Sequence, residues 1–161
     1  MSTLFVFNPE HDCALAVGNG PYTPPLEVRK LRTYNSLLPG KLAGNGDFIL
    51  IPSDLSRQMI SSLPYYQFIA GKNVRLIYPE EILEIAGKIK FILPWGWDHS
   101  IRRFLNEKGI SPSLLPSDAQ LENIRQLSHR RTTIPFRDTI ASLLKEPLLN
   151  PARELKSVEE V

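Results

Sequence analysis

Apolar residues in this chain form short continuous runs, and the segments between these runs have the apolar spacing of helices. Short apolar runs bounded by glycine, proline or aspartate are typical of strands that are covered on both faces. Strands of this kind that alternate with helices predict an open, mainly parallel α/β sheet of four or five strands with helices on both faces. The expected strands cover residues 3–7, 47–52, 74–78 and 89–94.

Proline residues mark the first long helix. We expect it to begin near Pro25, because proline is tolerated in a first helical turn, and to end at Pro39-Gly40. Leu31, Tyr34 and Leu38 have the spacing of one helical face, so we expect them to pack toward the core.

Capping residues mark the later helices. Asp98 is placed to cap a helix that follows the fourth strand. Ser117 and Gln120 have the spacing of a capping box at the start of the next helix. Pro135 predicts a break before a last amphipathic helix.

Length, composition and charge narrow the class of protein. The chain has 161 residues, with 42% hydrophobic and 22% charged residues, which is enough for one α/β domain with a sizeable core. The net charge of +2 gives no reason to expect a nucleic-acid partner. We expect no membrane span and no signal peptide, and the single cysteine, Cys13, fits a cytoplasmic protein. We expect the Cys13 thiol to be buried and unreactive.

Two polar loops carry the candidate chemistry. Asn8, Glu10, His11 and Asp12 follow the first strand, and the second loop follows the fourth strand. The carboxyl ends of parallel strands share one edge of a sheet, where ligands bind, so we expect the two loops to converge there. In the second loop Gly96 allows a close backbone approach, and an indole is able to stack on a ligand ring. The candidate binding residues of that loop are Trp95, Trp97 and Asp98.

The same residues also have structural interpretations. Asn8 and Asp12 are suited to cap a turn and a helix, with Glu10 and His11 solvated, and the two indoles are suited to cover the sheet edge. Carboxylates and imidazoles also act as metal ligands or as general acids and bases. No pair here has a tight metal-ligand spacing, so we assign no metal ligands and no catalytic residue. Further along, Ser128, His129 and Arg130 are a candidate anion-binding group, with a solvated surface as the alternative.

Three motifs together resemble a group of bacterial proteins of uncharacterised role. They are FNPEHDCALA (residues 7–16), PWGWD (residues 94–98) and IRQLSHRR (residues 124–131). In that group a Rossmann-like α/β domain, the pre-ATP-grasp domain, precedes an ATP-grasp-like domain. The resemblance implies an α/β domain over residues 1–146 and a linker over residues 147–161 that leads to a C-terminal domain missing from this chain.

The resemblance also implies a function. ATP-grasp enzymes activate a carboxylate as an acyl phosphate and transfer it to an amine or thiol, and the preceding domain contributes to the substrate side. Asn8, Glu10, His11, Asp12, Trp95, Trp97 and Asp98 would then line the substrate side. Ser128, His129 and Arg130 would lie at the junction with the nucleotide domain. ATP and magnesium are expected only with that C-terminal domain, so these residues alone are not a competent ligase.

Two other functions remain open on the sequence. One is a stand-alone module that binds a small anionic ligand at the carboxyl edge of the sheet. The other is a small metal-dependent hydrolase that uses Glu10, His11, Asp12 and Asp98. The expected partners are a small molecule and the missing domain, and a homodimer is also open.

Overall fold

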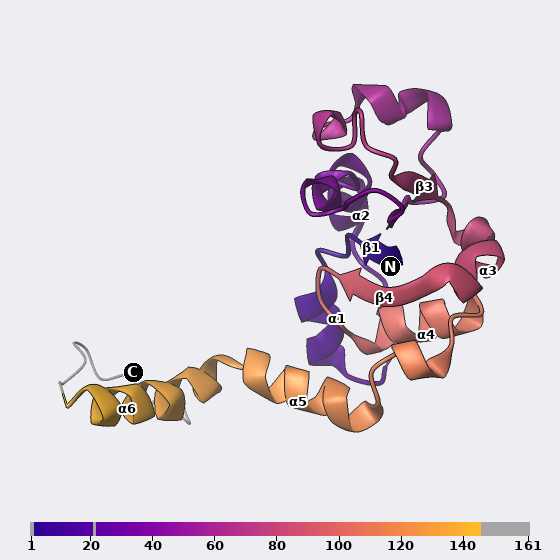
Figure 1. Ribbon diagram of the computed structural model, residues 1–161. Helices are drawn as coiled ribbons and strands as arrows, with labels where there is room; N and C mark the ends of the chain where they lie inside the picture. The colour runs from indigo at the N-terminus through magenta and orange to yellow at the C-terminus, as the bar shows by residue number, and fades with distance from the viewer. Residues whose placement is uncertain (1, 21, 146–161) are drawn as a thin grey trace. The chain divides into compact units, whose positions relative to one another are not determined.

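The chain begins in the middle of a parallel sheet, which it then extends first on one side and afterwards on the other. The computed structural model describes residues 2–20 and 22–145 (Figure 1). Its four strands are β1 (Ser2–Val6), β2 (Phe48–Leu50), β3 (Arg75–Ile77) and β4 (Ile89–Pro94). They lie in the order β3-β2-β1-β4, and every pairing is parallel. The predicted open parallel α/β sheet is therefore confirmed.

Helices and 3₁₀ helices connect the strands. The α-helices are α1 (His11–Val17), α2 (Leu26–Tyr34), α3 (Ile82–Ile85), α4 (His99–Glu107), α5 (Asp118–Ser128) and α6 (Thr133–Leu144). The 3₁₀ helices are η1 (Leu38–Lys41), η2 (Arg57–Ser62), η3 (Tyr66–Phe68), η4 (Pro79–Glu81), η5 (Ala86–Lys88), η6 (Pro112–Leu114) and η7 (Arg130–Thr132). Within the described residues, none of these helices has the length and apolar character needed to cross a membrane.

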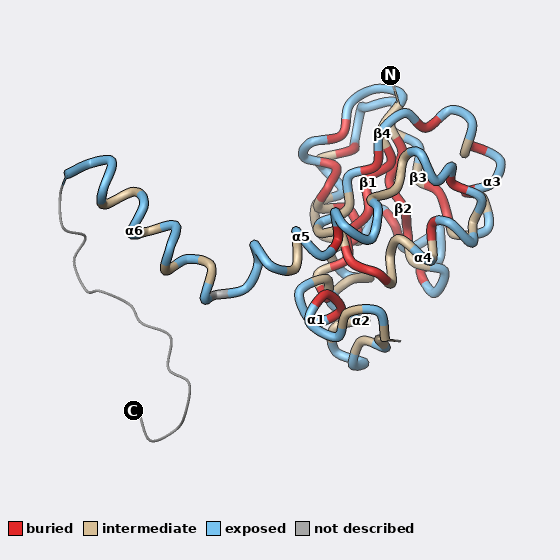
Figure 2. The backbone as a smooth tube through the Cα atoms, turned by 90° about the horizontal axis from the view of Figure 1, so that it is seen from below, coloured by how far each residue is buried: buried red, intermediate tan, exposed pale blue. Residues whose placement is uncertain are grey.

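Each face of the sheet carries its own apolar core. Leu4 and Val6 of β1 point to the core formed with α3 and α4, in which Ile82 and Leu105 are fully buried. Phe5 points to the opposite core, which includes Ile60 of η2 together with Leu37 and Ile69, the residues that flank η1 and η3. This alternation along β1 explains why Leu4, Phe5 and Val6 are all apolar. Figure 2 shows the buried backbone gathered at the strands.

The prediction that α2 packs an apolar face against the core is wrong. Leu31 and Tyr34 are exposed, and α2 has no buried residue. Leu37, which follows the helix, fills the core instead and is completely buried. Because η1 to η3 already cover this part of the sheet, α2 lies with most of its surface in solvent.

The predicted helix starts are confirmed at two places. Asp98 accepts hydrogen bonds from the first backbone N–H groups of α4. In the capping box before α5, the Gln120 N–H donates to Ser117 Oγ, and Gln120 Oε1 accepts from the Ser117 N–H. The expected break near Pro135 is also present, because α5 ends at Ser128 and Pro135 lies in the first turn of α6.

The chain divides into two compact units, with the boundary between Leu121 and Glu122. The first unit contains the sheet and both cores, and the second contains η7 and α6. The sequence predicts a domain boundary at residue 146. Residue 146 and the predicted linker over residues 147–161 lie outside the described residues.

Candidate functional site

The strand order places a switch point between β1 and β4. The connections after β1 and β2 extend the sheet in one direction, and β4 is added on the other side of β1. In open α/β sheets, ligands bind at the carboxyl ends of the strands where the order reverses. The loops that follow β1 and β4 meet at this point, as the sequence predicts.

Asn8 holds the two loops together. Its Nδ2 donates to the Gly96 carbonyl oxygen at 2.7 Å and to Asp98 Oδ2 at 3.2 Å. Its Oδ1 accepts from the Gly96 N–H at 3.4 Å. Asn8 is buried, so this side chain joins the carboxyl ends of β1 and β4 from within the fold.

Asp98 is the buried counterpart of Asn8. Its Oδ1 accepts from the Ser100 N–H at 2.7 Å and from the Ile101 N–H at 2.9 Å. The positive end of α4 and the Asn8 amide stabilise this carboxylate, which is only 2% exposed. Its main role in this arrangement is therefore to cap α4 and fix the second loop.

Glu10 forms an ion pair with a residue that the sequence analysis did not select. Arg32 Nη1 of α2 donates to Glu10 Oε1 at 2.7 Å. The other oxygen, Oε2, is buried and has no hydrogen-bond partner among the described residues. A buried acceptor without a partner is costly, so a donor that reached this oxygen would be stabilised there.

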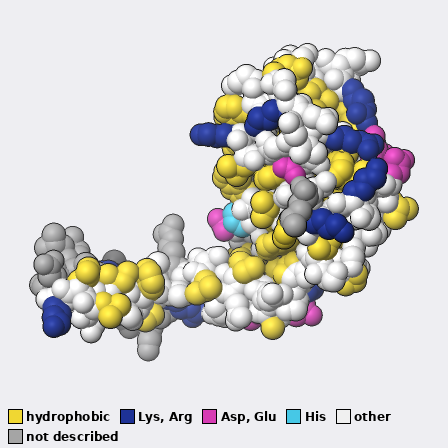
Figure 3. Space-filling model, in the orientation of Figure 1, with side chains coloured by type: hydrophobic (Ala, Val, Ile, Leu, Met, Phe, Trp, Pro, Cys, Tyr) yellow, Lys and Arg dark blue, Asp and Glu magenta, His cyan; other side chains and the backbone are white. Residues whose placement is uncertain are grey.

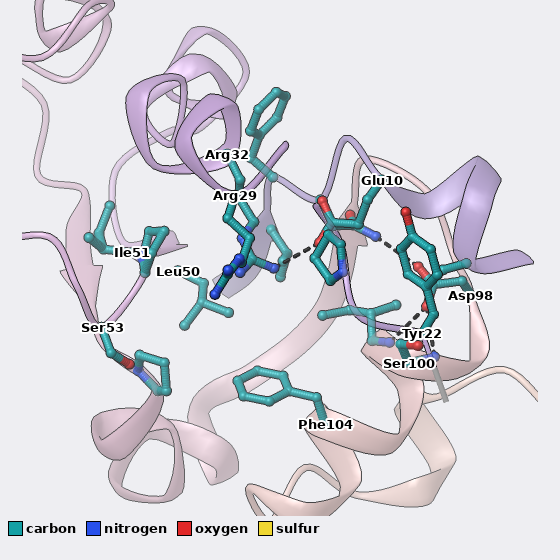
Figure 4. Close-up of a pocket in the computed structure, with 18 of the residues that line it drawn as sticks. Glu10, Tyr22, Arg29, Arg32, Leu50, Ile51, Ser53, Asp98, Ser100 and Phe104 are labelled. Carbon is teal, nitrogen blue, oxygen red and sulfur yellow. Dashed lines mark hydrogen bonds and ion pairs between the residues drawn. The ribbon is translucent and has the colours of Figure 1, made fainter. Parts of the chain in front are cut away.

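A cavity of about 500 Å³ lies beside this ion pair. Its walls come from the carboxyl ends of β1 and β2, from α2 and from the first turns of α4. Figure 4 shows the Arg29 and Arg32 side chains reaching from α2 toward the cavity, with Phe104 of α4 on another wall. Asn8, Glu10 and Asp98 line it, so the structure brings these three predicted residues together.

His11 and Asp12 lie outside the lining of the cavity. The His11 ring packs on Gly96, where a Cβ atom would lie 1.9 Å from His11 Cδ2. Gly96 thus permits the close approach of a side chain, whereas the sequence suggests the approach of a ligand. His11 Nε2 lies 3.1 Å from Asp12 Oδ1, and Asp12 is exposed.

Trp95 and Trp97 also lie outside the lining. Trp95 is exposed and meets Phe7 edge to face, with the ring centroids 5.2 Å apart. Trp97 is partly buried and packs against the core beneath α4. Both positions agree with the alternative that the indoles cover the sheet.

In the sequence Arg29, Lys30 and Arg32 form a basic run whose usual place is a solvated surface, so the sequence does not point to a role at the cavity. Arg29 and Arg32 are one helical turn apart and therefore lie on the same face of α2. The three-residue spacing of these arginines would have indicated a shared basic face, but a basic run on an exposed helix more often lies on a solvated surface. Ser53 and Asp54, which follow β2, were missed because only long-range packing brings them to the cavity.

Tyr22 and Cys13 lie close together near the cavity. Burial raises the pKa of Tyr22, and this desolvation is the largest cause. A hydrogen bond to Cys13 and the charge of Glu10 raise the pKa further. Cys13 is exposed, so the expectation of a buried thiol is wrong. The buried residues of α1 are Ala14 and Leu15, which leaves Cys13 on the outer face of this short helix.

The acidic residues and histidines form no metal centre in the part of the chain that the structure describes. No group of three His, Cys, Asp or Glu side chains is arranged there to hold a metal ion. Asp98 caps α4, Glu10 pairs with Arg32, and His11 packs on Gly96. Among the described residues, the side chains named for the hydrolase hypothesis are therefore not gathered into a group of three ligands.

The candidate anion-binding group lies at the break between α5 and α6, in the second unit. Ser128 ends α5, and His129 is exposed and accepts a long hydrogen bond of 3.4 Å from the Arg131 N–H. The side chain of Arg130 lies outside the described part of the structure.

Comparison of the chain with protein-family models, with curated proteins and with solved structures finds no match. The fold and the cavity thus define the class only as an open parallel α/β domain with a small-molecule-sized cavity at its switch point.

Proposed function

We propose that the α/β domain binds a small molecule through an anionic group at the switch-point cavity. The observation that carries this proposal is the Arg29 guanidinium. It extends toward the cavity and makes no hydrogen bond or ion pair with any residue in the described ranges (Figure 4). Arg32 beside it is already neutralised by Glu10, so Arg29 is the cation available to a ligand.

The acidic residues of the cavity are compatible with this assignment. Asp98 is compensated by two backbone N–H groups and by Asn8. Asp54 is exposed, where water screens its charge, and its one hydrogen bond is a long contact of 3.4 Å from Thr33 Oγ1. The Glu10–Arg32 pair sums to zero charge. Arg29 is then the group best placed to receive a carboxylate or phosphate.

The size and the remaining walls fit a small organic ligand. A volume of about 500 Å³ lies inside the range of roughly 300–1,000 Å³ that is usual for such sites. Phe104, Ile101 and Leu50 add apolar lining to the cavity. Figure 4 shows Phe104 on the side away from Arg29 and Arg32. A ligand with an anionic group at one end and an apolar body would satisfy both walls.

Binding by the purified chain tests the proposal. The probes are acetate, succinate, glutamate, inorganic phosphate and glycerol phosphate, titrated while chemical shifts are followed by NMR. Arg29 is exposed, where a single ion pair contributes at most about 1 kcal/mol, so Arg29→Gln should weaken binding by up to about fivefold.

Lys30→Gln is the matched control. It removes the same charge from the neighbouring position of α2, but Lys30 pairs with Glu27 and does not line the cavity. It should leave the affinity close to that of the unaltered chain, because the Lys30 charge is exposed and already paired with Glu27. Equal affinity of Arg29→Gln and the unaltered chain, or no binding of any probe, would contradict the proposal.

A second candidate function is the substrate-side domain of an ATP-grasp-like ligase. The observation that favours it is α6, which has no buried residue and exposes Phe136, Leu143 and Leu144. Figure 3 shows hydrophobic side chains gathered along this helix. A following nucleotide-binding domain would cover such a face, and the ligand of the cavity would then be the ligase substrate.

The source gene tests this second candidate. The ligase hypothesis expects an open reading frame beyond the codon for Val161 that encodes a lysine-bearing strand and a glycine-rich loop, which would hold ATP with magnesium. A stop codon directly after Val161 would contradict it and would leave anionic ligand binding as the proposal for this chain.

A further inference from the structure

Only one oxygen of the Glu10 carboxylate has a hydrogen-bond partner in the cavity wall. Oε1 accepts from Arg32 Nη1 at 2.7 Å, whereas Oε2 is buried and has no partner among the described residues. The Glu10 side chain is only 9% exposed, so water does little to compensate this oxygen. Oε2 is therefore an acceptor of the cavity wall that still lacks a donor.

The other acids of the cavity differ from Glu10 in this respect. Asp98 Oδ1 accepts from two backbone N–H groups, and Asp98 Oδ2 accepts from the Asn8 amide. Asp54 is exposed, so water solvates its carboxylate. Among the described lining residues, Glu10 is thus the acid that holds a buried oxygen without a donor.

The lining of the cavity carries more negative than positive charge. Its charged side chains are three carboxylates and two guanidinium groups, from Glu10, Asp54, Asp98, Arg29 and Arg32. A ligand with an anionic group alone would add to the negative excess, whereas a ligand that also carries a cation leaves the excess unchanged. Because like charges in a partly enclosed site repel, this balance favours an ammonium group beside the anionic group of the ligand.

Arg29 and Glu10 are close enough for a small molecule to reach both. Arg29 and Arg32 are three residues apart on α2, which places their Cβ atoms about 5–6 Å from each other. Arg32 in turn contacts Glu10 directly (Figure 4). The last torsion of a glutamate side chain is broad, and a guanidinium presents a fork of several donors. The carboxylate can therefore turn Oε2 toward the cavity while its ion pair with Arg32 persists.

We propose that the ligand of this cavity is a small zwitterion of the amino-acid class, whose ammonium binds Glu10 Oε2 and whose carboxylate binds Arg29. This inference rests on the proposed anion binding at Arg29 and adds the group that distinguishes an amino acid from a simple acid. The ammonium donates the hydrogen bond that Oε2 lacks. Apolar lining residues such as Phe104 and Ile101 are then available to the side chain of the amino acid.

Pairs of probes that differ only in the amine test the proposal on the whole purified chain. Alanine is compared with propionate, and glutamate with glutarate, in titrations followed by NMR chemical shifts. The bond to the buried Glu10 carboxylate should make each amino acid bind about tenfold more tightly than its amine-free counterpart. Equal affinity within each pair would overturn the zwitterion and leave anion binding at Arg29 intact. If neither member of any pair binds, anion binding at Arg29 fails as well.

Lactate separates the positive charge from the hydrogen bond, because it has a hydroxyl group in place of the ammonium of alanine. Lactate should bind more weakly than alanine, since a hydroxyl donates a hydrogen bond but brings no charge to the lining. Lactate that binds as tightly as alanine would overturn the proposal, because it would show that any donor satisfies Oε2.

Glu10→Gln tests the acceptor itself. The variant should weaken the binding of alanine but not that of propionate, because Arg32 loses its anionic partner, so the tenfold preference should fall to about one. A purely structural role of Glu10 would weaken both ligands alike and keep the preference, and this result would overturn its assignment. If the variant fails to fold, the probe pairs still decide the proposal with the unaltered chain.

Glu27→Gln is the matched control. It makes the same chemical change at an exposed position of α2, where Glu27 pairs with Lys30 and does not line the cavity. The preference for alanine over propionate should therefore stay at about tenfold in this variant. A preference that falls equally in Glu27→Gln and Glu10→Gln would overturn the assignment of the ammonium to Glu10.

Discussion

Replacement of Asp98 by alanine should strongly destabilise the first unit. Asp98 is 2% exposed and accepts two backbone hydrogen bonds at 2.7 and 2.9 Å from the first turn of α4, and a third at 3.2 Å from Asn8. Loss of an N-cap alone costs about 1 kcal/mol, and the buried Asn8 amide also loses one acceptor. We expect the free energy of unfolding to fall by about 3 kcal/mol.

This loss is measured by urea unfolding of the whole chain. Trp95 and Trp97 flank the loop and are the only two tryptophans, so their fluorescence reports this unit directly. In a thermal scan the same loss corresponds to a melting temperature lower by about 10 °C for a unit of this size. Asp54→Ala is the control, because Asp54 is exposed and should change stability by less than about 0.5 kcal/mol.

Asp98→Asn separates the two roles of the carboxylate. The amide oxygen still caps α4, but the new NH₂ group faces Asn8 Nδ2, so two donors oppose each other. We expect a loss between zero and that of Asp98→Ala. Stability of Asp98→Ala within about 0.5 kcal/mol of the unaltered chain would refute the reasoning, because it would show that the buried contacts of Asp98 contribute little.

Three other predictions follow from buried or crowded positions. Gly96→Ala should cost about 1–3 kcal/mol in urea unfolding, because the added methyl would overlap the His11 ring, and His11→Ala should restore part of it. If His11→Ala restores nothing, this contact is not the cause. Burial raises the pKa of Tyr78, so the folded state favours the neutral phenol. The stability that the neutral phenol contributes is present below about pH 10, the pKa in the unfolded chain, and is lost as the pH rises through the folded pKa. Unfolding between pH 9 and 11 should show a smaller pH dependence in Tyr78→Phe, and an equal dependence would contradict this. Cys13 should react stoichiometrically with a thiol reagent in the native chain, and protection until unfolding would contradict its exposure.

The strands and their convergence could be predicted because they depend on local patterns. A run such as residues 47–52 is apolar at each central position, and only a strand with two covered faces uses such a run fully. Parallel order then places the Asn8 and Asp98 loops at one edge without any knowledge of side-chain contacts.

The cavity wall from α2 could not be predicted in the same way. The periodicity of α2 places Leu31 and Tyr34 on an apolar face, yet both are exposed, because η1 to η3 occupy the sheet face that they would have covered. Arg29 and Arg32 then face the cavity for reasons of long-range packing. The contact of His11 with Gly96 is equally non-local, since it joins residues 85 positions apart in the chain.

The occupied N-terminus of α4 has a consequence for how this domain can change. Because Asp98 already uses the first N–H groups of that helix, they are not available to a ligand, and selectivity depends on side chains. Two of those side chains, Arg29 and Arg32, come from α2, none of whose residues is buried. Substitution of Arg29 can therefore alter what the domain recognises at little cost in stability, whereas substitution of Arg32 would leave the buried Glu10 carboxylate unpaired.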